Sequence, residues 1–425
     1  MKILVLTDKY FPKPLANAVC AQELIRVWNN CGHTVDVLAY DNYDETPLEW
    51  EGNRVFYVKP DLRLRLFYFA DAYKNTKKGK RANFFANVLS KVKGALLLPW
   101  QPFYSFSFPN RIYKKLCELT TENDYDAIVA ILNPIDSCIA ANRFKKKNKN
   151  IPYVVFSVDT LKKAFLQKYV STKFADGSFW VKRILKCCDA YFYMQSRREE
   201  YAYKKYDKYR DKLVETDLPR FKIKDCSKIS PYDFGEPAEH WVYAGSIGGV
   251  HYNSDGLINI FKKISNNRKR ILHMYVRGEE ARRIADIAQK ENLNIKVHGY
   301  VDFATLERVM ASADVIVSLK TSDQVSAKIF ECMSYGKPIV HFSGHKEDPN
   351  VGYLEKYPLC KVVKTYSNDI RGEILALENF LKTISKGTCI DVTDLKIIFY
   401  KSTPEHSAKE ILEKVITCKA RQNFD

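Results

Sequence analysis

Short apolar runs alternate along the chain with longer segments whose apolar residues recur at helical spacing. Residues 3–7 form the first apolar run, residues 18–30 have the spacing of a helix, and residues 34–38 form the next run. Strands buried in parallel sheets are near-continuous apolar runs, and helices connect them. The pattern predicts a strand, helix, strand unit with a right-handed crossover at the start of the chain.

The alternation continues through the rest of the sequence. Apolar runs at 127–132 and 153–157 predict two further strands in the first half. Ser, Pro, Gly and Asp then cluster over 222–239 without periodicity, which predicts a linker between domains. Strands are next predicted at 240–244, 272–276, 295–298, 315–318 and 338–341, and helices at 255–264, 279–290, 303–312 and 327–335.

The length of 425 residues exceeds the usual size of one hydrophobic core. We therefore predict an N-terminal Rossmann-like domain over 1–225 and a C-terminal Rossmann-like domain over 236–403. Both are expected to be α/β layers with a parallel sheet covered on both faces. The amphipathic helix within 404–425 is expected to cross back to the first domain.

The cysteines and the apolar runs indicate the compartment. Eleven cysteines are scattered from Cys20 to Cys418 without paired CxxC units, which favours reduced thiols over disulfides or a structural metal site. The sequence starts on an apolar run that ends at an acidic residue, unlike a signal peptide, and no run of 18 apolar residues follows. A cytoplasmic protein is expected.

The net charge of +18 lies mostly in the first half of the chain. Residues 1–225 hold 40 Lys and Arg against 25 Asp and Glu. Aromatic residues are interleaved with these cations, which fits a solvated helix face, an anionic membrane surface or nucleic acid. Nucleic acid is the least favoured, because no aromatic RNA-binding motif, zinc-finger spacing or basic region beside heptads is present. The aromatic and Lys-rich stretch 63–108 is less regular and contains Pro99 and Pro102, although its Phe84, Val88 and Leu89 recur at helical spacing; it is predicted to be an insertion near the acceptor side.

Two loops of the C-terminal half have the character of phosphate-binding segments. Gly245–Gly249 follows a predicted strand and has the backbone freedom that close approach to a phosphate requires. Residues 318–340 join a strand to a helix and place Ser322 and Ser326 near free backbone amides. On that helix Lys328 and Glu331 share a face, where they fit either one ligand or an exposed ion pair.

The sequence around these loops resembles the family 4 group of retaining glycosyltransferases. The resemblance is carried by Lys328, Phe330, Glu331, Met333 and the Gly-Lys-Pro-Ile-Val segment 336–340. The segments VYAGSI, YVRG, VHGYV and ASADVIVSL follow in the order and spacing of the family, and the first strand also resembles its N-terminal strand. The resemblance implies a GT-B fold, in which the two Rossmann-like domains face each other across a cleft.

The resemblance also implies roles for single residues. Gly245, Ser246, Ser326, Lys328 and Glu331 are expected to bind the donor, with Lys328 at the diphosphate and Glu331 at the nucleotide ribose. The family has a Glu where Asp323 stands, so Asp323 is expected to contact the transferred sugar.

Three further positions are assigned where the sequence departs from the family. Arg277 and Lys320 are expected to replace basic residues that the family carries elsewhere. Asp159 stands in place of a strand-end His, and it fits either an acceptor-side polar group or a helix N-cap.

The expected function is transfer of a hexose from a UDP- or GDP-linked sugar to a glycan or lipid-linked acceptor, with retention, in surface polysaccharide biosynthesis. No cofactor and no metal are expected beyond the nucleotide-sugar. The basic N-terminal half is expected to contact the inner face of the plasma membrane, and no nucleic acid is expected as a partner. A polyanion-binding or nucleic-acid-binding protein and a catalytically inactive GT-B scaffold are the alternatives.

Overall fold

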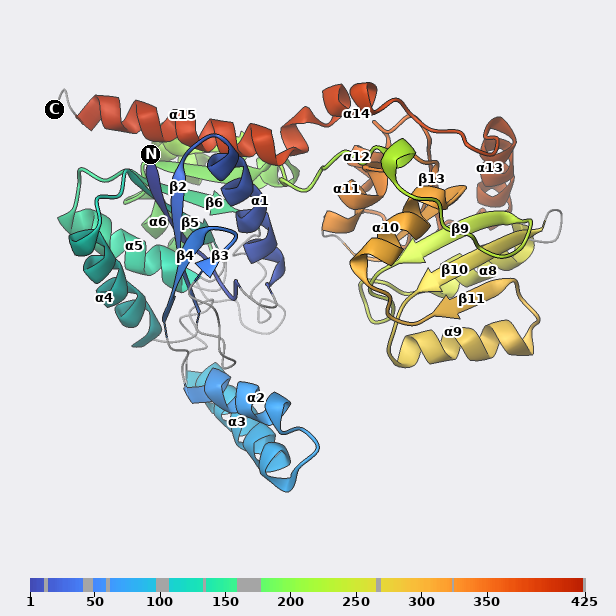
Figure 1. Ribbon diagram of the computed structural model, residues 1–425, viewed down its shortest axis with the longest axis horizontal. Coiled ribbons are helices and arrows are strands. Elements are labelled where there is room, and N and C mark those ends of the chain that lie inside the picture. Colours follow the sequence, from blue (N-terminus) through green and yellow to red (C-terminus); the bar gives the residue numbers. More distant parts are fainter. Residues whose placement is uncertain are drawn as a thin grey trace. The chain divides into compact units, whose positions relative to one another are not determined.

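The computed structural model describes residues 1–10, 14–40, 49–58, 62–96, 107–132, 135–158, 177–264, 269–322 and 325–422. The chain divides into two compact units (Figure 1). Unit 1 comprises Met1–Pro219 with Pro404–Asp425, and unit 2 comprises Arg220–Thr403. Each unit has its own sheet and its own hydrophobic core.

Unit 1 is built on an eight-stranded sheet with the strand order β3-β4-β2-β1-β5-β6-β7-β8. Every neighbouring pair is parallel except the short β3, which is antiparallel at the edge. Its strands are β1 (Lys2–Leu6), β2 (Thr34–Tyr40), β3 (Glu49–Trp50), β4 (Asn53–Val58), β5 (Ala127–Leu132), β6 (Tyr153–Ser157), β7 (Ala190–Met194) and β8 (Leu213–Thr216).

The helices of unit 1 connect these strands, and one of them is the last helix of the chain. They are α1 (Ala16–Asn30), α2 (Leu62–Ala72), α3 (Lys77–Leu96), α4 (Ser107–Glu122), α5 (Ile135–Lys147), α6 (Ser178–Leu185), α7 (Arg198–Ala202) and α15 (Pro404–Gln422). The strands predicted at 3–7, 34–38, 127–132 and 153–157 are confirmed, because fully buried apolar runs such as β5 leave little other choice.

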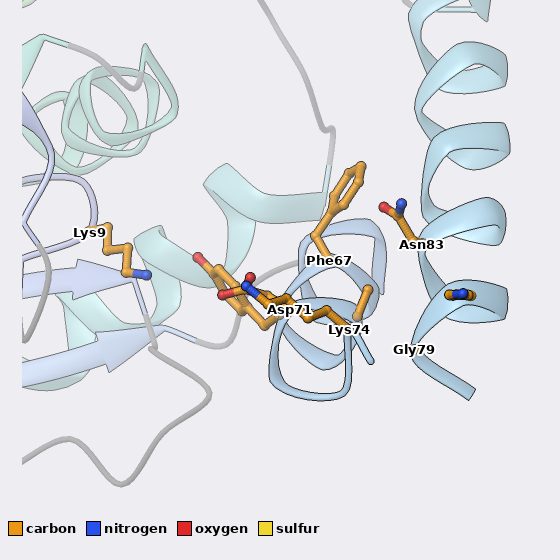
Figure 2. Close-up of a pocket in the computed structure, with 9 residues that line it drawn as sticks. Lys9, Phe67, Asp71, Lys74, Gly79 and Asn83 are labelled. Carbon is orange, nitrogen blue, oxygen red and sulfur yellow. The ribbon is translucent and has the colours of Figure 1, made fainter. Parts of the chain in front are cut away.

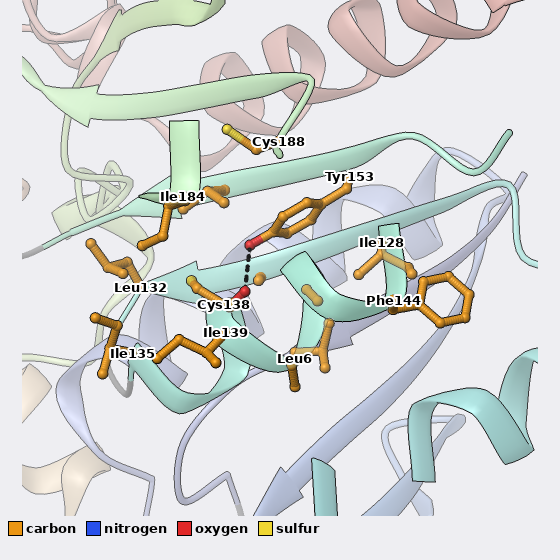
Figure 3. Packing of buried hydrophobic residues seen from close by; sticks show 14 of the residues in the cluster. Leu6, Ile128, Leu132, Ile135, Cys138, Ile139, Phe144, Tyr153, Ile184 and Cys188 are labelled. Atoms are coloured by element: carbon orange, nitrogen blue, oxygen red, sulfur yellow. Dashed lines mark hydrogen bonds between the residues drawn. The ribbon is translucent and has the colours of Figure 1, made fainter. Parts of the chain in front are cut away.

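The core between the sheet and α5 is closely packed around Tyr153 (Figure 3). This side chain is buried, and its hydroxyl donates a hydrogen bond to the Cys138 carbonyl oxygen at 3.2 Å. The surrounding side chains, Leu6, Ile128, Leu132 and Ile184 among them, are apolar. The only polar atom that Tyr153 brings into this core is therefore satisfied.

The last helix, α15, packs on α1 within unit 1. The indole Nε1 of Trp28 donates to the carbonyl oxygen of Ala408 at 3.1 Å, and Lys419 pairs with Asp126. The last helix of the chain therefore belongs to the unit that contains the first strand.

Unit 2 is built on a six-stranded parallel sheet with the order β11-β10-β9-β12-β13-β14. Its strands are β9 (Glu239–Ala244), β10 (Arg270–Tyr275), β11 (Ile295–His298), β12 (Val315–Lys320), β13 (Ile339–Ser343) and β14 (Cys360–Lys364). Its helices are α8 (Asp255–Ile264), α9 (Glu279–Lys290), α10 (Phe303–Ser312), α11 (Ala327–Met333), α12 (Val351–Leu354), α13 (Ile370–Thr383) and α14 (Val392–Ile398).

Two segments differ from the sequence-based expectation. The predicted linker at 222–239 belongs to unit 2, because the Lys224 amide donates to the Ser334 carbonyl oxygen at 2.8 Å and the chain already packs there. In the less regular stretch 63–108 the described part forms the helical hairpin α2–α3 and the start of α4, and Phe84, Val88 and Leu89, noted for their helical spacing, lie in α3. Pro99 and Pro102 lie outside the described residues.

Candidate functional site

The order of strands in unit 2 reverses between β9 and β12. The chain runs from β9 to β10 and β11 on one side and from β12 to β13 and β14 on the other. Connections that leave in opposite directions open a crevice at the carboxyl ends of the two central strands, where open α/β sheets bind ligands. Gly245 directly follows β9, and Lys320 is the last residue of β12.

A cavity of about 450 Å³ lies at this edge of the sheet. It is formed by the segments that follow β9, β10 and β11, together with one side chain from α11. The lining residues are Gly245, Ser246, Ile247, Tyr275, Val276, Arg277, Gly299, Tyr300, Val301, Leu306 and Lys328.

Lys328 reaches from α11 to the backbone at the end of β9. A Cβ atom built on Gly245 would stand 2.0 Å from the Lys328 Nζ, which is far inside contact distance. The φ angle of Gly245 is 143°, a conformation that side-chain-bearing residues rarely adopt. Glycine is therefore required here both for the turn and for the approach of the ammonium group.

The ammonium group of Lys328 is buried without a hydrogen-bond partner among the described residues. Its Nζ lies 5.2 Å from the centre of the Tyr252 ring. Burial lowers the pKa of Lys328 below its ordinary value, although the nearby Tyr252 and Glu331 favour the charged form. Burying an ammonium group whose N–H donors have no acceptor costs free energy. The site is therefore suited to an incoming anion.

A second lysine flanks the same aromatic ring. The Lys320 side chain is buried, and its Nζ stands 4.5 Å from the Tyr252 ring centre. Burial alone would raise the pKa of the Tyr252 hydroxyl, but Lys320, the Ser326 hydrogen bond and Lys328 outweigh it and lower this pKa. Sequence reasoning missed Tyr252, because it lies in a loop without periodicity.

The loop that carries Tyr252 is fixed to the end of β12. The Thr321 hydroxyl donates to the Val250 carbonyl oxygen at 2.6 Å, and the Thr321 amide donates to the His251 carbonyl oxygen at 3.0 Å. Within the loop the Gly248 amide donates to the Tyr252 carbonyl oxygen at 2.8 Å. These bonds fix the loop that places the Tyr252 ring next to both lysines.

A buried polar network supports the segment before α11. His341 Nε2 lies 2.9 Å from an Asp348 carboxylate oxygen, and neither side chain is exposed. Asn350 donates to Asp348 and accepts a hydrogen bond of 2.7 Å from the Ser326 amide. The network anchors the first residue before α11 to the strand beneath, so the position of Lys328 is set by the core.

The comparisons with known proteins identify this part of the chain. Residues 239–354 match the family model described as Glycosyl transferases group 1. The chain is a glycosyltransferase. A search among curated protein sequences gave no match to the chain.

Solved glycosyltransferase structures share the fold along nearly the whole chain. A glycosyltransferase from Rickettsia africae has a TM-score of 0.63 at 12% identity, over 98% of each chain. The E. coli trehalose-6-phosphate protein bound with UDP-2-fluoro glucose has 0.58 at 11% identity, over 98% of this chain and 99% of that chain. The lipopolysaccharide outer core galactosyltransferase WaaB, in its apo form, has 0.57 at 12% identity, over 98% and 99%. The shared fold is the two-domain, Rossmann-like GT-B fold.

The glycosyltransferase brings most of the predicted donor residues to one place. Gly245, Ser246, Arg277 and Lys328 line the same cavity, and the Lys320 and Lys328 ammonium groups both lie close to the Tyr252 ring. Arg277 is exposed and, within the part of the chain that the structure describes, has no ion pair.

Ser322, Ser326 and Glu331 occupy the segment between β12 and the end of α11. The Ser322 hydroxyl is buried and has no partner among the described residues. Glu331 is half-buried on α11, and the described side chains give it no ion pair with Lys328. The alternative reading of Lys328 and Glu331 as an exposed ion pair therefore does not describe this glycosyltransferase.

Two predicted residues cannot be placed in the site. Asp159 and Asp323 lie outside the described residues. Their roles at the acceptor and at the transferred sugar stay predictions.

The glycosyltransferase has another polar cavity, in unit 1, of about 470 Å³ (Figure 2). It lies between Lys9, just after β1, and the α2–α3 hairpin. The Lys9 Nζ stands 5.0 Å from the Tyr68 ring centre. Its lining residues are Lys9, Phe67, Tyr68, Ala70, Asp71, Lys74, Gly79, Lys80 and Asn83. Three lysines against one aspartate make this cavity electropositive.

Metal ligation has no candidate in the part of the glycosyltransferase that the structure covers. No group of three His, Cys, Asp or Glu side chains among the described residues is placed to hold a metal ion. Metal independence of the donor site stays a prediction.

Proposed function

We propose that this glycosyltransferase transfers a hexose from a UDP- or GDP-linked sugar to a glycan or lipid-linked acceptor, with retention of configuration, in surface polysaccharide biosynthesis. The observation that carries the proposal is the buried Lys328 ammonium, which has no hydrogen-bond partner among the described residues and lies against Gly245, at the reversal of strand order in unit 2. A diphosphate oxygen is the anion that such a site accepts in this fold class.

The leaving group of the reaction is the nucleoside diphosphate. Breaking the bond between sugar and phosphate builds negative charge on that group, so a site catalyses the step by stabilising the charge. Lys328 and Arg277 line one cavity and supply two positive charges, and Lys320 adds a third next to Tyr252. With this many cations from the chain itself, no metal is needed in the proposal.

Orientation of the donor is assigned to carboxylates on either side of the diphosphate. Glu331 lies one helical turn from Lys328 on α11, where it would accept hydrogen bonds from the ribose hydroxyls. Asp323 would contact the transferred hexose, and Asp159 would act on the acceptor side. Tyr300, exposed at the cavity, is positioned as a surface for the nucleobase.

The acceptor is assigned to unit 1. The electropositive cavity at Lys9, Lys74 and Lys80 lies beyond the carboxyl end of β1, and it fits a phosphate-bearing acceptor such as a lipid-linked sugar. The known relative WaaB acts on lipopolysaccharide outer core by its name, which supports an acceptor of a surface glycan. The protein would then work in the cytoplasm, at the inner face of the plasma membrane.

A turnover screen tests the proposal. Purified protein is incubated with UDP-, GDP-, ADP- and CMP-sugars, with magnesium and with EDTA, and release of the free nucleotide is followed. We expect one donor to be consumed equally under both conditions. Glu331→Ala should lower kcat/KM at least about tenfold, which corresponds to roughly 1.4 kcal/mol of transition-state stabilisation.

Other outcomes of the same screen separate the alternatives. Donor binding without turnover would assign the chain to inactive GT-B scaffolds. Salt-dependent binding to RNA or heparin without any nucleotide-sugar binding would assign it to polyanion-binding proteins. Unchanged kinetics in Glu331→Ala would remove that residue from the donor site.

A further inference from the structure

The α2–α3 hairpin of unit 1 has an inner face made of small residues. Gly79, Ala82 and Ala86 are the buried side of α3, and they let it approach α2 closely. A Cβ on Gly79 would come within 1.9 Å of the Tyr73 carbonyl oxygen, so the start of α3 tolerates no larger residue there. Leu89 is half-buried beside these small residues, whereas the other large apolar side chains of α3 are exposed.

The outer face of α3 carries those apolar side chains instead. Five of them are 41% to 73% exposed, and four recur at spacings of three and four residues along the helix: Phe85, Val88, Val92 and Leu96, with Phe84 beside them. The two rings of Phe84 and Phe85 pack edge to face with centroids 5.9 Å apart. A contiguous apolar face of this kind on a surface helix marks a binding surface.

Basic side chains border the apolar face. Residues 62–96 contain nine Lys and Arg and one Asp, a net charge of +8. Lys77, Lys80, Arg81 and Lys91 are exposed, and none of them has an ion pair with any described residue. The surface thus combines an apolar centre with unneutralised positive charge at its edges.

We propose that the outer face of α3 binds the surface of an anionic lipid bilayer, with Phe84, Val88 and Val92 at the boundary of headgroups and acyl chains and the flanking lysines at lipid phosphates. This combination of an apolar face with bordering cations is the arrangement by which amphipathic helices lie in a membrane interface. The inference deepens the proposed function and rests on its membrane-bound acceptor.

The observations favour a bilayer over other occupants. Aliphatic side chains such as Val88, Val92 and Leu96 offer nothing to bases or phosphates of a nucleic acid, but they fit the acyl boundary of a lipid layer. A second copy of the chain would bring two hairpins of charge +8 together, which like-charge repulsion opposes.

The hairpin also lines the electropositive cavity. Lys74, Lys80 and Asn83 belong to the hairpin or its turn, and they line the cavity that ends at Lys9 (Figure 2). When α3 lies on the bilayer, this cavity is held close to the headgroups. A phosphate-bearing lipid acceptor could enter it without leaving the membrane.

Vesicle flotation of the full-length protein tests the inference. We expect binding to vesicles of phosphatidylcholine with phosphatidylglycerol and none to phosphatidylcholine alone. Substitution of the apolar face (Phe84→Ser, Val88→Ser and Val92→Ser together) should reduce the bound fraction at least about tenfold at limiting lipid. Charge reversal at its edge (Lys77→Glu, Lys80→Glu and Arg81→Glu) should do the same, with a smaller dependence on salt remaining.

Matched controls carry equivalent changes away from the hairpin. Leu375→Ser with Ile397→Ser alters side chains of comparable exposure in unit 2, and Lys204→Glu with Lys208→Glu reverses exposed charges elsewhere in unit 1. Both controls should bind anionic vesicles as the unaltered protein does. Far-ultraviolet circular dichroism and the thermal shift with donor nucleotide show that each variant is folded.

The outcomes separate this inference from the proposed function. Donor binding without vesicle binding, or hairpin variants that float as well as the unaltered protein, would overturn the membrane contact alone. A dimer in sedimentation that the apolar-face variant dissociates would assign α3 to self-association and overturn the inference as well. Vesicle binding without any donor binding would overturn the proposed function and leave the membrane contact standing.

Discussion

The ammonium group of Lys328 lies directly against the Cα of Gly245, at the end of β9, where both residues line the cavity of unit 2. Lys328 comes from α11, and Gly245 comes from the loop that follows β9. A side chain at position 245 would occupy the space that the Lys328 ammonium group fills. The glycine makes room for the ammonium group, which has no hydrogen-bond partner in the described part of the chain. This pair is the centre of the proposed diphosphate site.

Gly245→Ala is expected to weaken nucleotide-sugar binding about tenfold or more, because the added methyl group displaces Lys328 Nζ and the φ angle of 143° strains any other residue. Gly249→Ala is the matched control, since its φ angle of 66° is also unfavourable but its Cβ would meet no atom within 4 Å. Isothermal titration calorimetry compares the two. Equal losses in both variants would show that backbone strain alone explains the effect.

Arg277→Ala should weaken binding of the nucleoside diphosphate about tenfold while the affinity for the nucleoside stays the same, because the exposed guanidinium faces the cavity and has no ion pair in the described structure. The loss should shrink at high salt. Arg282→Ala, an exposed arginine of α9 that does not line the cavity, serves as the control. An equal change for nucleoside and diphosphate would contradict a phosphate contact.

Asn350→Ala removes the side chain that accepts a hydrogen bond from the Ser326 amide and donates one to Asp348. Both bonds belong to the buried network that supports the segment before α11. Leaving those groups unsatisfied should lower the free energy of unfolding by about 1–3 kcal/mol and loosen the segment that precedes Lys328. Urea denaturation and donor titration measure the two effects. Asn379→Ala, on the exposed side of α13, should change neither, and a variant that keeps both stability and affinity would show that the network does not position the loop.

Three histidines on adjacent strands predict a pH dependence of stability. His273 accepts or donates at 3.0 Å to both His240 and His298, and burial, with His298 and His240 next, lowers the pKa of His273 to about 3. In the unfolded chain its pKa is about 6.5, so below that pH the unfolded state binds the proton and the folded state does not.

Stability should therefore be complete above about pH 6.5 and should fall as the pH drops toward 3. In His273→Gln, the urea midpoint of unfolding should depend less on pH between about 7 and 5 than in the unaltered protein. His406→Gln, a control at a half-buried histidine of α15, should keep the full dependence. Identical pH profiles for all three proteins would contradict the assignment to His273.

The parallel sheets could be predicted from sequence because their strands are buried on both faces. The run Ala127–Leu132 contains no polar position and the run 315–319 contains one, and the helices between the strands have clear periodicity. The donor residues Lys328 and Gly245 followed from motif resemblance. Their direct contact could not be predicted, since it depends on how α11 packs against the sheet at β12.

Tyr252 and the α2–α3 hairpin show why the rest was missed. Tyr252 lies next to two lysines because its loop is hydrogen-bonded to Thr321, a residue distant in sequence, which no local pattern encodes. The hairpin buries Gly and Ala and exposes Phe and Val, the reverse of the usual helix pattern. The spacing of Phe84, Val88 and Leu89 indicated a helix there, but the pairing of α3 with α2 through small residues could not be predicted. Asp159 and Asp323 stay predictions.

The most direct test of the account measures thermal shifts with nucleotide-sugars for the unaltered protein and for Lys328→Met. Methionine keeps most of the volume of lysine without its charge, so the ligand-free variant should be at least as stable as the unaltered protein, because a buried unpaired ammonium has been removed. We predict that one UDP- or GDP-sugar raises the melting temperature of the unaltered protein and leaves that of Lys328→Met unchanged. An equal rise in both proteins would contradict the assignment of Lys328 as the diphosphate-binding group.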